Sequence, residues 1–415
     1  MKAIVTIWSI LLPMAAYAQQ CWSLGDCIAY AHSHNITVLE QDINIEESKV
    51  SGTAALLAML PQLNFSGGRN DVWYGENSGS HAWEATFEGS WVVFDSFSRY
   101  NTLLSRRLNT SAARLADEAL RGEISLRVTE SYLKIMLSAE LLECAREEYS
   151  SICKEKERVE ALVEVGSAPL SSLYTVESQC AGEYADVVKA ECDLKSSKMA
   201  LFQLLNLPYD ESFTAFCTIA DSLPKPPEFS YAEIVTLAGK RPEIRRLSVE
   251  EQARRKSEVA TKCAAVPYIA LSAEHIGSEL YPGGKSSAIE LQLVVPILDG
   301  GAAYGAIRRS SLEHRRSSLE KERGLVEMTS TIQSAFLEAG NLYNMALAGK
   351  ARLSAAKALL SSSEAKFRSG SITAAEFAVS RSDYLSARGS EISARWQYLF
   401  QLKIADYYRG IPIEL

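Results

Sequence analysis

The side chains that most often carry out catalysis are scattered through this sequence rather than grouped. The five histidines include one close pair, His32 and His34, but a separation of two residues places them on different faces of a helix. The segment 283–286 ends like a phosphate-binding loop, yet the glycine required five positions before Gly284 is Glu279. We therefore expect no catalytic residues, no metal site and no cofactor.

Length and charge limit the remaining classes of function. The 415 residues suggest two or three domains, or one architecture built twice. The net charge of -8 argues against a general nucleic-acid binder, which needs basic stripes to neutralise phosphates. The mean hydropathy of -0.06 argues against a helical membrane protein.

The first 18 residues are typical of a secretory signal peptide. Lys2 supplies the positive charge, a short apolar stretch follows, and Ala16–Ala18 is a cleavage site of small residues. Cleavage would leave a chain that begins at Gln19. Cys21 raises the question of a lipid anchor, but the sequence before it lacks the small residue that a lipidation site needs. We therefore expect an exported protein.

The rest of the chain contains an internal repeat, with the same features in the same order in both copies. The matched segments are 60–63 with 266–269, 92–95 with 296–299, and 165–167 with 369–371, at offsets of 204 to 206 residues. This period is too long for a solenoid repeat. The proline-rich segment 207–230 separates the copies as a linker would. The sequence predicts a first repeat over 19–206 and a second over 231–415.

Each repeat contains a predicted pair of strands. Trp83–Val93 alternates apolar and polar side chains with an aromatic-rich face, and Ile289–Ile297 alternates in the same way. The predicted pairs are 62–74 with 83–94, and 266–280 with 287–298. A half-buried sheet in a soluble domain is one interpretation. The other is a membrane barrel, for which four strands are too few and the twelve strands of three chains are enough.

Long helices surround these strands. Ser98–Glu164 contains no proline and would extend about 100 Å at ~1.5 Å per residue. Glycines then predict turns into return helices. The predicted helices are 23–59, 98–164 and 171–206 in the first repeat, with a turn at Gly166, and 302–368 and 373–409 in the second, with a turn at Gly370.

These features together resemble the TolC-like outer-membrane efflux family. The resemblance rests on Leu24-x-x-Cys27-Ile28-x-x-Ala31, Leu60–Leu63, the Phe94-Asp95 strand exit, the glycine of each hairpin turn and the duplication. It implies a mainly α fold with a small β part, as a homotrimer with a twelve-stranded β-barrel on a twelve-helix periplasmic α-barrel. It also implies a passive export channel in the bacterial outer membrane. The implied partners are outer-membrane lipid, a periplasmic adaptor and an inner-membrane pump of RND, ABC or MFS type.

The resemblance also implies roles for individual residues. The hairpin tips would contact the adaptor, although each glycine could serve only the turn; the tip residues are Val165, Gly166, Ser167, Leu170, Ser369, Gly370 and Ser371. Glu376, six positions after the second glycine, would form a carboxylate ring at the periplasmic gate, or would be an ordinary solvated glutamate. The family pattern departs at Val379 and at Ser172, where acids are common.

Two further sets of residues follow from the predicted elements. Glu84, Glu88 and Glu290 would face the barrel lumen if the aromatic faces meet lipid. In an antiparallel hairpin Cys153 would face Cys180, and an oxidising periplasm permits a disulfide there. The alternative is that both are small apolar packing residues.

Two other classes of protein also use long helices. A periplasmic adaptor has one hairpin inside split β-domains, whereas this chain has two hairpins, each preceded by strands. A coiled-coil scaffold would not need the aromatic alternation of Trp83–Val93. The sequence does not reveal the cargo, because a passive channel has no substrate pocket.

Overall fold

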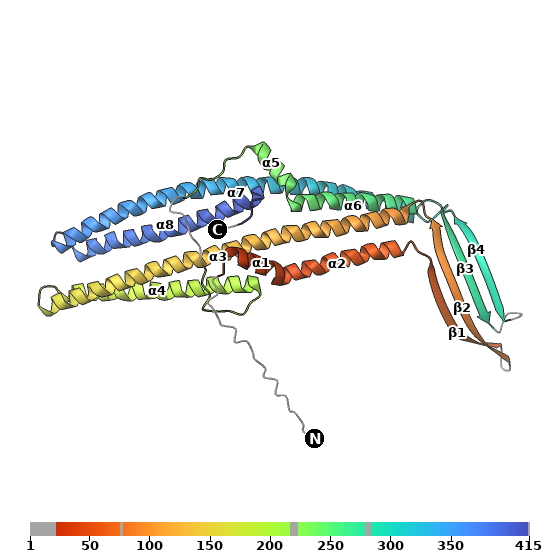
Figure 1. The fold of residues 1–415 in the computed structure, drawn as a ribbon, viewed down its shortest axis with the longest axis horizontal. Coiled ribbons are helices and arrows are strands. Elements are labelled where there is room, and N and C mark those ends of the chain that lie inside the picture. The colour runs from red at the N-terminus through yellow and green to blue at the C-terminus, as the bar shows by residue number, and fades with distance from the viewer. Residues whose placement is uncertain (1–21, 75–77, 216–222, 279–283, 414–415) are drawn as a thin grey trace, which may run out of the picture. The chain divides into compact units, whose positions relative to one another are not determined.

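The computed structural model describes residues 22–74, 78–215, 223–278 and 284–413 (Figure 1). The predicted signal peptide and Cys21 lie outside this part. The described helices are α1 (Leu24–His34), α2 (Ile36–Leu57), α3 (Ser98–Glu164), α4 (Leu170–Leu205), α5 (Tyr231–Lys240), α6 (Pro242–Ala264), α7 (Ala302–Arg368) and α8 (Ala374–Arg409). The strands are β1 (Gln62–Tyr74), β2 (Ser78–Phe94), β3 (Tyr268–Ser278) and β4 (Lys285–Val294). None of the described helices is both long and apolar enough to cross a membrane.

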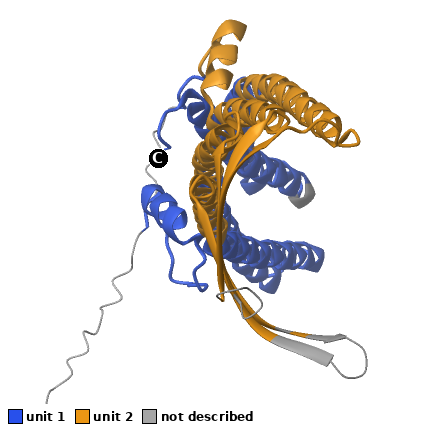
Figure 2. Ribbon diagram, turned by 90° about the vertical axis from the view of Figure 1, so that its right-hand side faces the viewer, with its two compact units in different colours: residues 1–35, 124–226, 338–415 blue, residues 36–123, 227–337 orange. Residues whose placement is uncertain are grey.

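The chain forms two compact units, and each takes residues from both sequence repeats (Figure 2). Unit 1 comprises residues 1–35, 124–226 and 338–415, and unit 2 comprises residues 36–123 and 227–337. The helices α3 and α7 each contribute to both units. The two copies are therefore interleaved, and neither copy is a compact body of its own.

The sheet of unit 2 contains the four strands in the order β1-β2-β3-β4, with every neighbouring pair antiparallel. Its outer strands, β1 and β4, each pair on one side only within the described chain. β4 ends at Val294, four residues earlier than predicted. Pro296 explains the early end, since it has no backbone N–H to donate to a ladder.

The helices of unit 2 form a layer in the order α2-α3-α6-α7. The amide of Gln41 on α2 donates to the carbonyl of Ala113 on α3 at 3.0 Å. Ser105 on α3 donates to the carbonyl of Ala253 on α6 at 2.9 Å. Lys321 on α7 forms an ion pair with Glu251 on α6 at 2.8 Å. The edges of the layer are therefore α2 and α7, which also adjoin the outer strands β1 and β4 in the chain.

The helices of unit 1 form the order α4-α3-α8-α7. The hydroxyls of Ser138 on α3 and Ser197 on α4 lie 3.1 Å apart, and those of Ser363 on α7 and Ser380 on α8 lie 3.0 Å apart. Buried apolar side chains fill the spaces between neighbours. One cluster joins α3 to α8 through Leu133, Cys144, Ile392 and Trp396, and another joins α3 to α4 through Ile152, Val159 and Val176.

The predicted single helix over 23–59 is wrong, because the chain leaves the helix at Asn35. This residue has an extended backbone, with φ -67° and ψ 128°, and its side-chain amide donates to the carbonyl of Leu204 at 2.8 Å. The second repeat breaks at the corresponding place, between α5 and α6. There Pro242 drives the preceding Arg241 into an extended conformation. The break at Asn35 instead coincides with the hydrogen bond to Leu204, a residue distant in the sequence.

Candidate functional site

The turns between the paired helices have the same backbone geometry in both repeats. Gly166 and Gly370 each have φ of +71°, in the left-handed region that favours glycine. The N–H of Ser167 donates to the carbonyl of Leu162 at 2.8 Å, and the N–H of Ser371 donates to that of Lys366 at the same distance. Each glycine therefore closes its helix and starts the return.

The side chains at the two tips are exposed. Val165 is 74% exposed and Leu170 is 51% exposed, although both are large and apolar. The remaining predicted tip residues are also exposed, namely Gly166, Ser167, Ser369, Gly370 and Ser371. The tips therefore present apolar side chains to solvent beside small polar ones.

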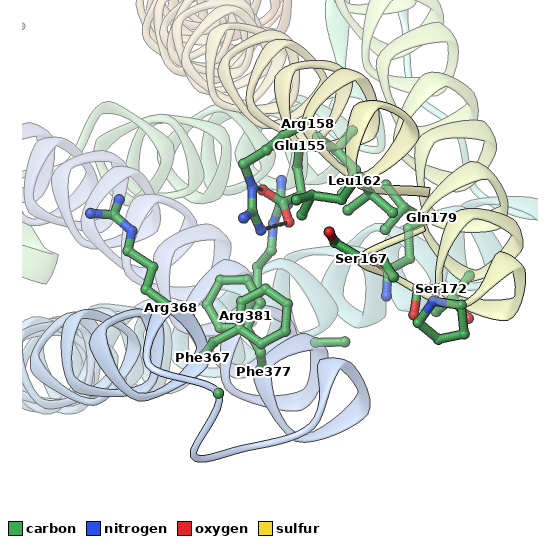
Figure 3. A pocket seen from close by; sticks show the side chains of 18 residues that line it. Glu155, Arg158, Leu162, Ser167, Ser172, Gln179, Phe367, Arg368, Phe377 and Arg381 are labelled. Carbon is green, nitrogen blue, oxygen red and sulfur yellow. Dashed lines mark hydrogen bonds and ion pairs between the residues drawn. The ribbon is translucent and has the colours of Figure 1, made fainter. Parts of the chain in front are cut away.

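A cavity of about 350 Å³ lies between the ends of the two hairpins (Figure 3). Its aromatic wall is Phe367 stacked on Phe377, with ring centroids 5.0 Å apart and planes 3° apart. The guanidinium of Arg158 lies 5.7 Å from the centre of the Phe367 ring and is paired with Glu155. The cavity also reaches the tip residues Ser167 and Gly370. Sequence reasoning missed this cavity because its walls come from both repeats.

Ion pairs join α3 of the first repeat to α8 of the second. The pairs are Arg381 with Glu148, Arg388 with both Glu147 and Glu148, and Arg395 with Glu140. The three arginines are seven residues apart and therefore share one face of α8. The Arg381 and Glu148 side chains are only 12% and 14% exposed. Burial raises the pKa of the nearby Glu183 carboxyl, and the charge of Arg381 acts in the opposite direction. The heptad spacing of these arginines is a signal that the sequence itself contains.

Glu376 lies in the first turn of α8 and forms a capping box with Thr373. Its N–H donates to the Thr373 hydroxyl at 3.2 Å, and its carboxylate accepts from the Thr373 N–H at 2.8 Å. These hydrogen bonds hold the pKa of the Glu376 carboxyl below its usual value. The side chain is exposed, so it is an anion in contact with solvent at neutral pH. Val379 is also exposed, and Ser172 lines the cavity.

The strand pairing brings the predicted glutamates of the sheet onto one face. Glu88 lies directly opposite Glu274, while Ser90 and Glu290 are both paired with Ser272. Glu84 and Glu88 are four residues apart on β2 and therefore point to the same side of the sheet. The carboxylates that share this face are those of Glu84, Glu88, Glu274 and Glu290. Trp83, Phe87 and Trp91 share the other. Sequence reasoning missed Glu274 because β3 alternates less regularly than β2.

The structure places Cys153 and Cys180 next to each other. Their sulfur atoms lie 3.6 Å apart between α3 and α4, and both are free thiols. Burial raises the pKa of the Cys180 thiol. Cys144, in contrast, is buried against α8, and Cys192 is exposed.

A family model decides the identity of this architecture. The model for outer membrane efflux proteins matches residues 28–207 and 234–403. The chain belongs to the outer membrane efflux protein family. The predicted family resemblance and the outer-membrane localisation are confirmed.

Individual members of the family are distant in sequence and close in fold. Outer membrane protein TolC of Vibrio cholerae is 26% identical over 171 residues, which are 38% of this chain and 36% of that protein. A CusC structure gives a TM-score of 0.84 at 16% identity and covers 94% of this chain and 92% of that one. The Campylobacter jejuni CmeC outer membrane channel gives 0.82 at 15% identity, covering 94% and 86%. The Neisseria gonorrhoeae MtrE channel gives 0.77 at 18% identity, covering 93% and 88%. The mainly α fold with a small sheet is therefore shared across these proteins.

Proposed function

We propose that this protein is the outer-membrane channel of a tripartite efflux or type I secretion system. The observation that carries the proposal is the four-stranded sheet, which has an aromatic face, an acidic face and two open edges. In lipid every backbone polar group needs a partner, so these edges must be paired. Three copies supply twelve strands, enough to close a barrel with the aromatic side chains facing lipid. The channel is passive, and its cargo is chosen by the pump.

The exposed hairpin tips support a periplasmic adaptor as the next partner. An adaptor would contact Val165, Leu170 and the small residues around Gly166 and Gly370, and would connect the channel to an inner-membrane pump of RND, ABC or MFS type. Val165→Asp and Leu170→Asp are expected to weaken co-purification with the adaptor. Leu359→Asp, at another exposed apolar position of unit 1, is the matched control.

The acidic residues support a preference for cations. Glu84, Glu88 and Glu290 would face the lumen of the barrel, and three copies of Glu376 would form a ring at the periplasmic gate. Such rings attract cations and resist anions. We propose Glu376→Gln as the variant that reduces cation selectivity, and Glu160→Gln, an exposed glutamate on α3 of the other hairpin, as its control.

Planar bilayers test the channel directly. Detergent-extracted protein is expected to be trimeric and to conduct ions with cation preference. Glu376→Gln should lower that preference, whereas Glu160→Gln should not. A monomer that stays soluble without detergent and does not conduct would contradict the proposal.

We also propose a disulfide between Cys153 and Cys180 in the exported protein. Neighbouring sulfur atoms in an oxidising compartment support it. Peptide maps with and without reductant should show one linked peptide pair, and Cys153→Ser should abolish it. A map without this pair would rule the disulfide out.

A further inference from the structure

The outer face of α2 carries a regular apolar stripe. Its side chains recur every seven residues and are between 56% and 66% exposed; they are Ile36, Ile43, Val50 and Leu57. The side chain of Val38 is fully buried and lies two positions after Ile36, about 200° further around the helix. The stripe therefore faces away from the side on which α2 packs against α3.

The outer face of α7 carries a second stripe with the same spacing. Leu312, Leu319 and Val326 are between 49% and 69% exposed. The packed positions lie two residues before each of them: Ser310 and Ser317 are buried, and Gly324 lies against Leu247 of α6. The second stripe therefore faces away from α6. Heptad spacing of apolar residues is the pattern of a helix that pairs with another helix.

The charges beside the two stripes are opposite in sign. Four residues after Ile36 and Ile43 stand the exposed acids Glu40 and Glu47. Four residues after Leu312 and Leu319 stand the exposed bases Arg316 and Arg323. Within the part of the chain that the structure describes, these arginines form ion pairs with the glutamates one turn along their own helix, Glu320 and Glu327, at 2.9 and 3.7 Å. Such exposed pairs exchange partners at little cost.

The directions in which α2 and α7 run relative to the sheet bring these opposite charges together when two copies pack side by side. α2 runs toward the sheet and enters β1, whereas α7 leaves β4 and runs away from the sheet (Figure 1). A pair of these helices from two copies, each beside an outer strand, is therefore antiparallel. Antiparallel packing keeps equivalent heptad positions of the two helices on the same side of the seam. If Leu57 is level with Gly305, the same register brings Val50 to Leu312, Ile43 to Leu319 and Ile36 to Val326. It also brings Glu47 to within one residue of the level of Arg316, and Glu40 to within one residue of the level of Arg323.

We propose that the α2 stripe of one copy docks against the α7 stripe of the next, with Glu40 and Glu47 paired to Arg323 and Arg316. This inference rests on the proposed trimeric channel and names the helical seam between its subunits. Each copy carries both complementary edges, so the contact runs head to tail and closes into a ring. The outer strands β1 and β4 lie at the same two edges in the same order, so the seam continues into the sheet.

Charge reversal of the full chain in detergent tests the seam. The double variants Glu40→Arg/Glu47→Arg and Arg316→Glu/Arg323→Glu should each weaken the monomer–trimer equilibrium about tenfold per interface, because two attractive pairs become repulsive. The variant with all four changes should recover the wild-type equilibrium. Arg107→Glu/Arg255→Glu, on exposed positions of the inner helices α3 and α6, is the charge-matched control and should change nothing. Sedimentation equilibrium gives the fold-change, and circular dichroism confirms that helix content is kept.

A photo-crosslinking residue at Val50 provides a readout that does not depend on stability. Crosslinks should join two copies and end in the α7 peptide that contains Leu312. If trimers form and conduct but the reversals match the control, the seam is wrong and the channel stands. Failure of the fourfold variant to recover, or crosslinks to a different protein, would also overturn the seam. If the wild type neither assembles nor conducts, the proposed function itself fails.

Discussion

The return helices α4 and α8 come from the same position in the two repeats, yet they differ in charge. Both are 36 residues long and both follow a glycine at φ +71°. At the offset of 204 residues, Arg381 and Arg395 of α8 correspond to Glu177 and Glu191 of α4. The shared features are therefore those that backbone geometry requires, and the side-chain charges have diverged.

Because of this divergence, the two helices that flank α3 present side chains of opposite charge to it. On one side, Lys156 and Arg146 of α3 pair with Glu177 and Glu191 of α4, at 3.2 and 2.8 Å. On the other side, glutamates of α3 pair with the arginines of α8. Because the two sets have opposite sign, neither return helix can take the other's place. Charge thus specifies how two similar hairpins are arranged within unit 1.

Removing a buried charge from the α8 side should have the largest effect. Arg381→Met removes the guanidinium that contacts the buried Glu148 carboxylate and leaves that carboxylate only its longer pair with Arg388, at a cost of about 2–3 kcal/mol in the free energy of local unfolding. Amide exchange followed by mass spectrometry should show faster opening of α8 around this position. The matched change on the α4 side is Glu177→Gln, whose pair with Lys156 is exposed and contributes below about 1 kcal/mol. Equal effects on the two sides would contradict the asymmetry.

Placing a side chain on the turn glycines should have an intermediate effect that is equal in the two repeats. Gly166→Ala and Gly370→Ala each force a left-handed backbone on alanine, at about 1–2 kcal/mol. Neither new Cβ atom would meet another group, so the cost is conformational alone. Amide exchange at each tip should therefore accelerate about tenfold. Gly182→Ala, in the middle of α4, should instead slow local opening, because alanine favours helix.

The sequence was most informative where local rules decide the structure. The bounds of α3 and α7 match the prediction at both ends, because proline-free segments end at a glycine that must be left-handed. The alternation of β2 correctly grouped Glu84 with Glu88. The break at Asn35 was missed, since its side chain bonds to Leu204, far away in the chain.

The cavity and the α3–α8 ion pairs were missed for the same physical reason. Each helix shows its own pattern in the sequence, but the pattern does not say which hairpin lies beside it. The heptad of Arg381, Arg388 and Arg395 indicates a charged contact face. Only the fold shows that this face meets α3 rather than α7 or solvent.

A smaller effect should distinguish how the two return helices begin. Thr373→Ala removes the hydroxyl that accepts from the Glu376 N–H, at a cost of about 1 kcal/mol to the first turn of α8. The first turn of α4 follows Pro169, which makes no side-chain cap. Ser171→Ala near that end is the control and should leave α4 unchanged. Amide exchange of the two first turns measures both.

The smallest effect is a pH dependence confined to the second repeat. Hydrogen bonds from Thr373 lower the pKa of Glu376 in the folded state, so its carboxylate stabilises the α8 cap above the unfolded pKa. That contribution is lost as the pH falls through the lowered folded pKa. Protection factors of the α8 first turn should therefore exceed those of Glu376→Gln at neutral pH and converge with them in acid. The first turn of α4, where Ser172 occupies the position of Glu376, should show no such convergence. A difference between wild type and Glu376→Gln that stays constant down to strongly acidic pH would mean that the charge of the carboxylate is not what stabilises this turn.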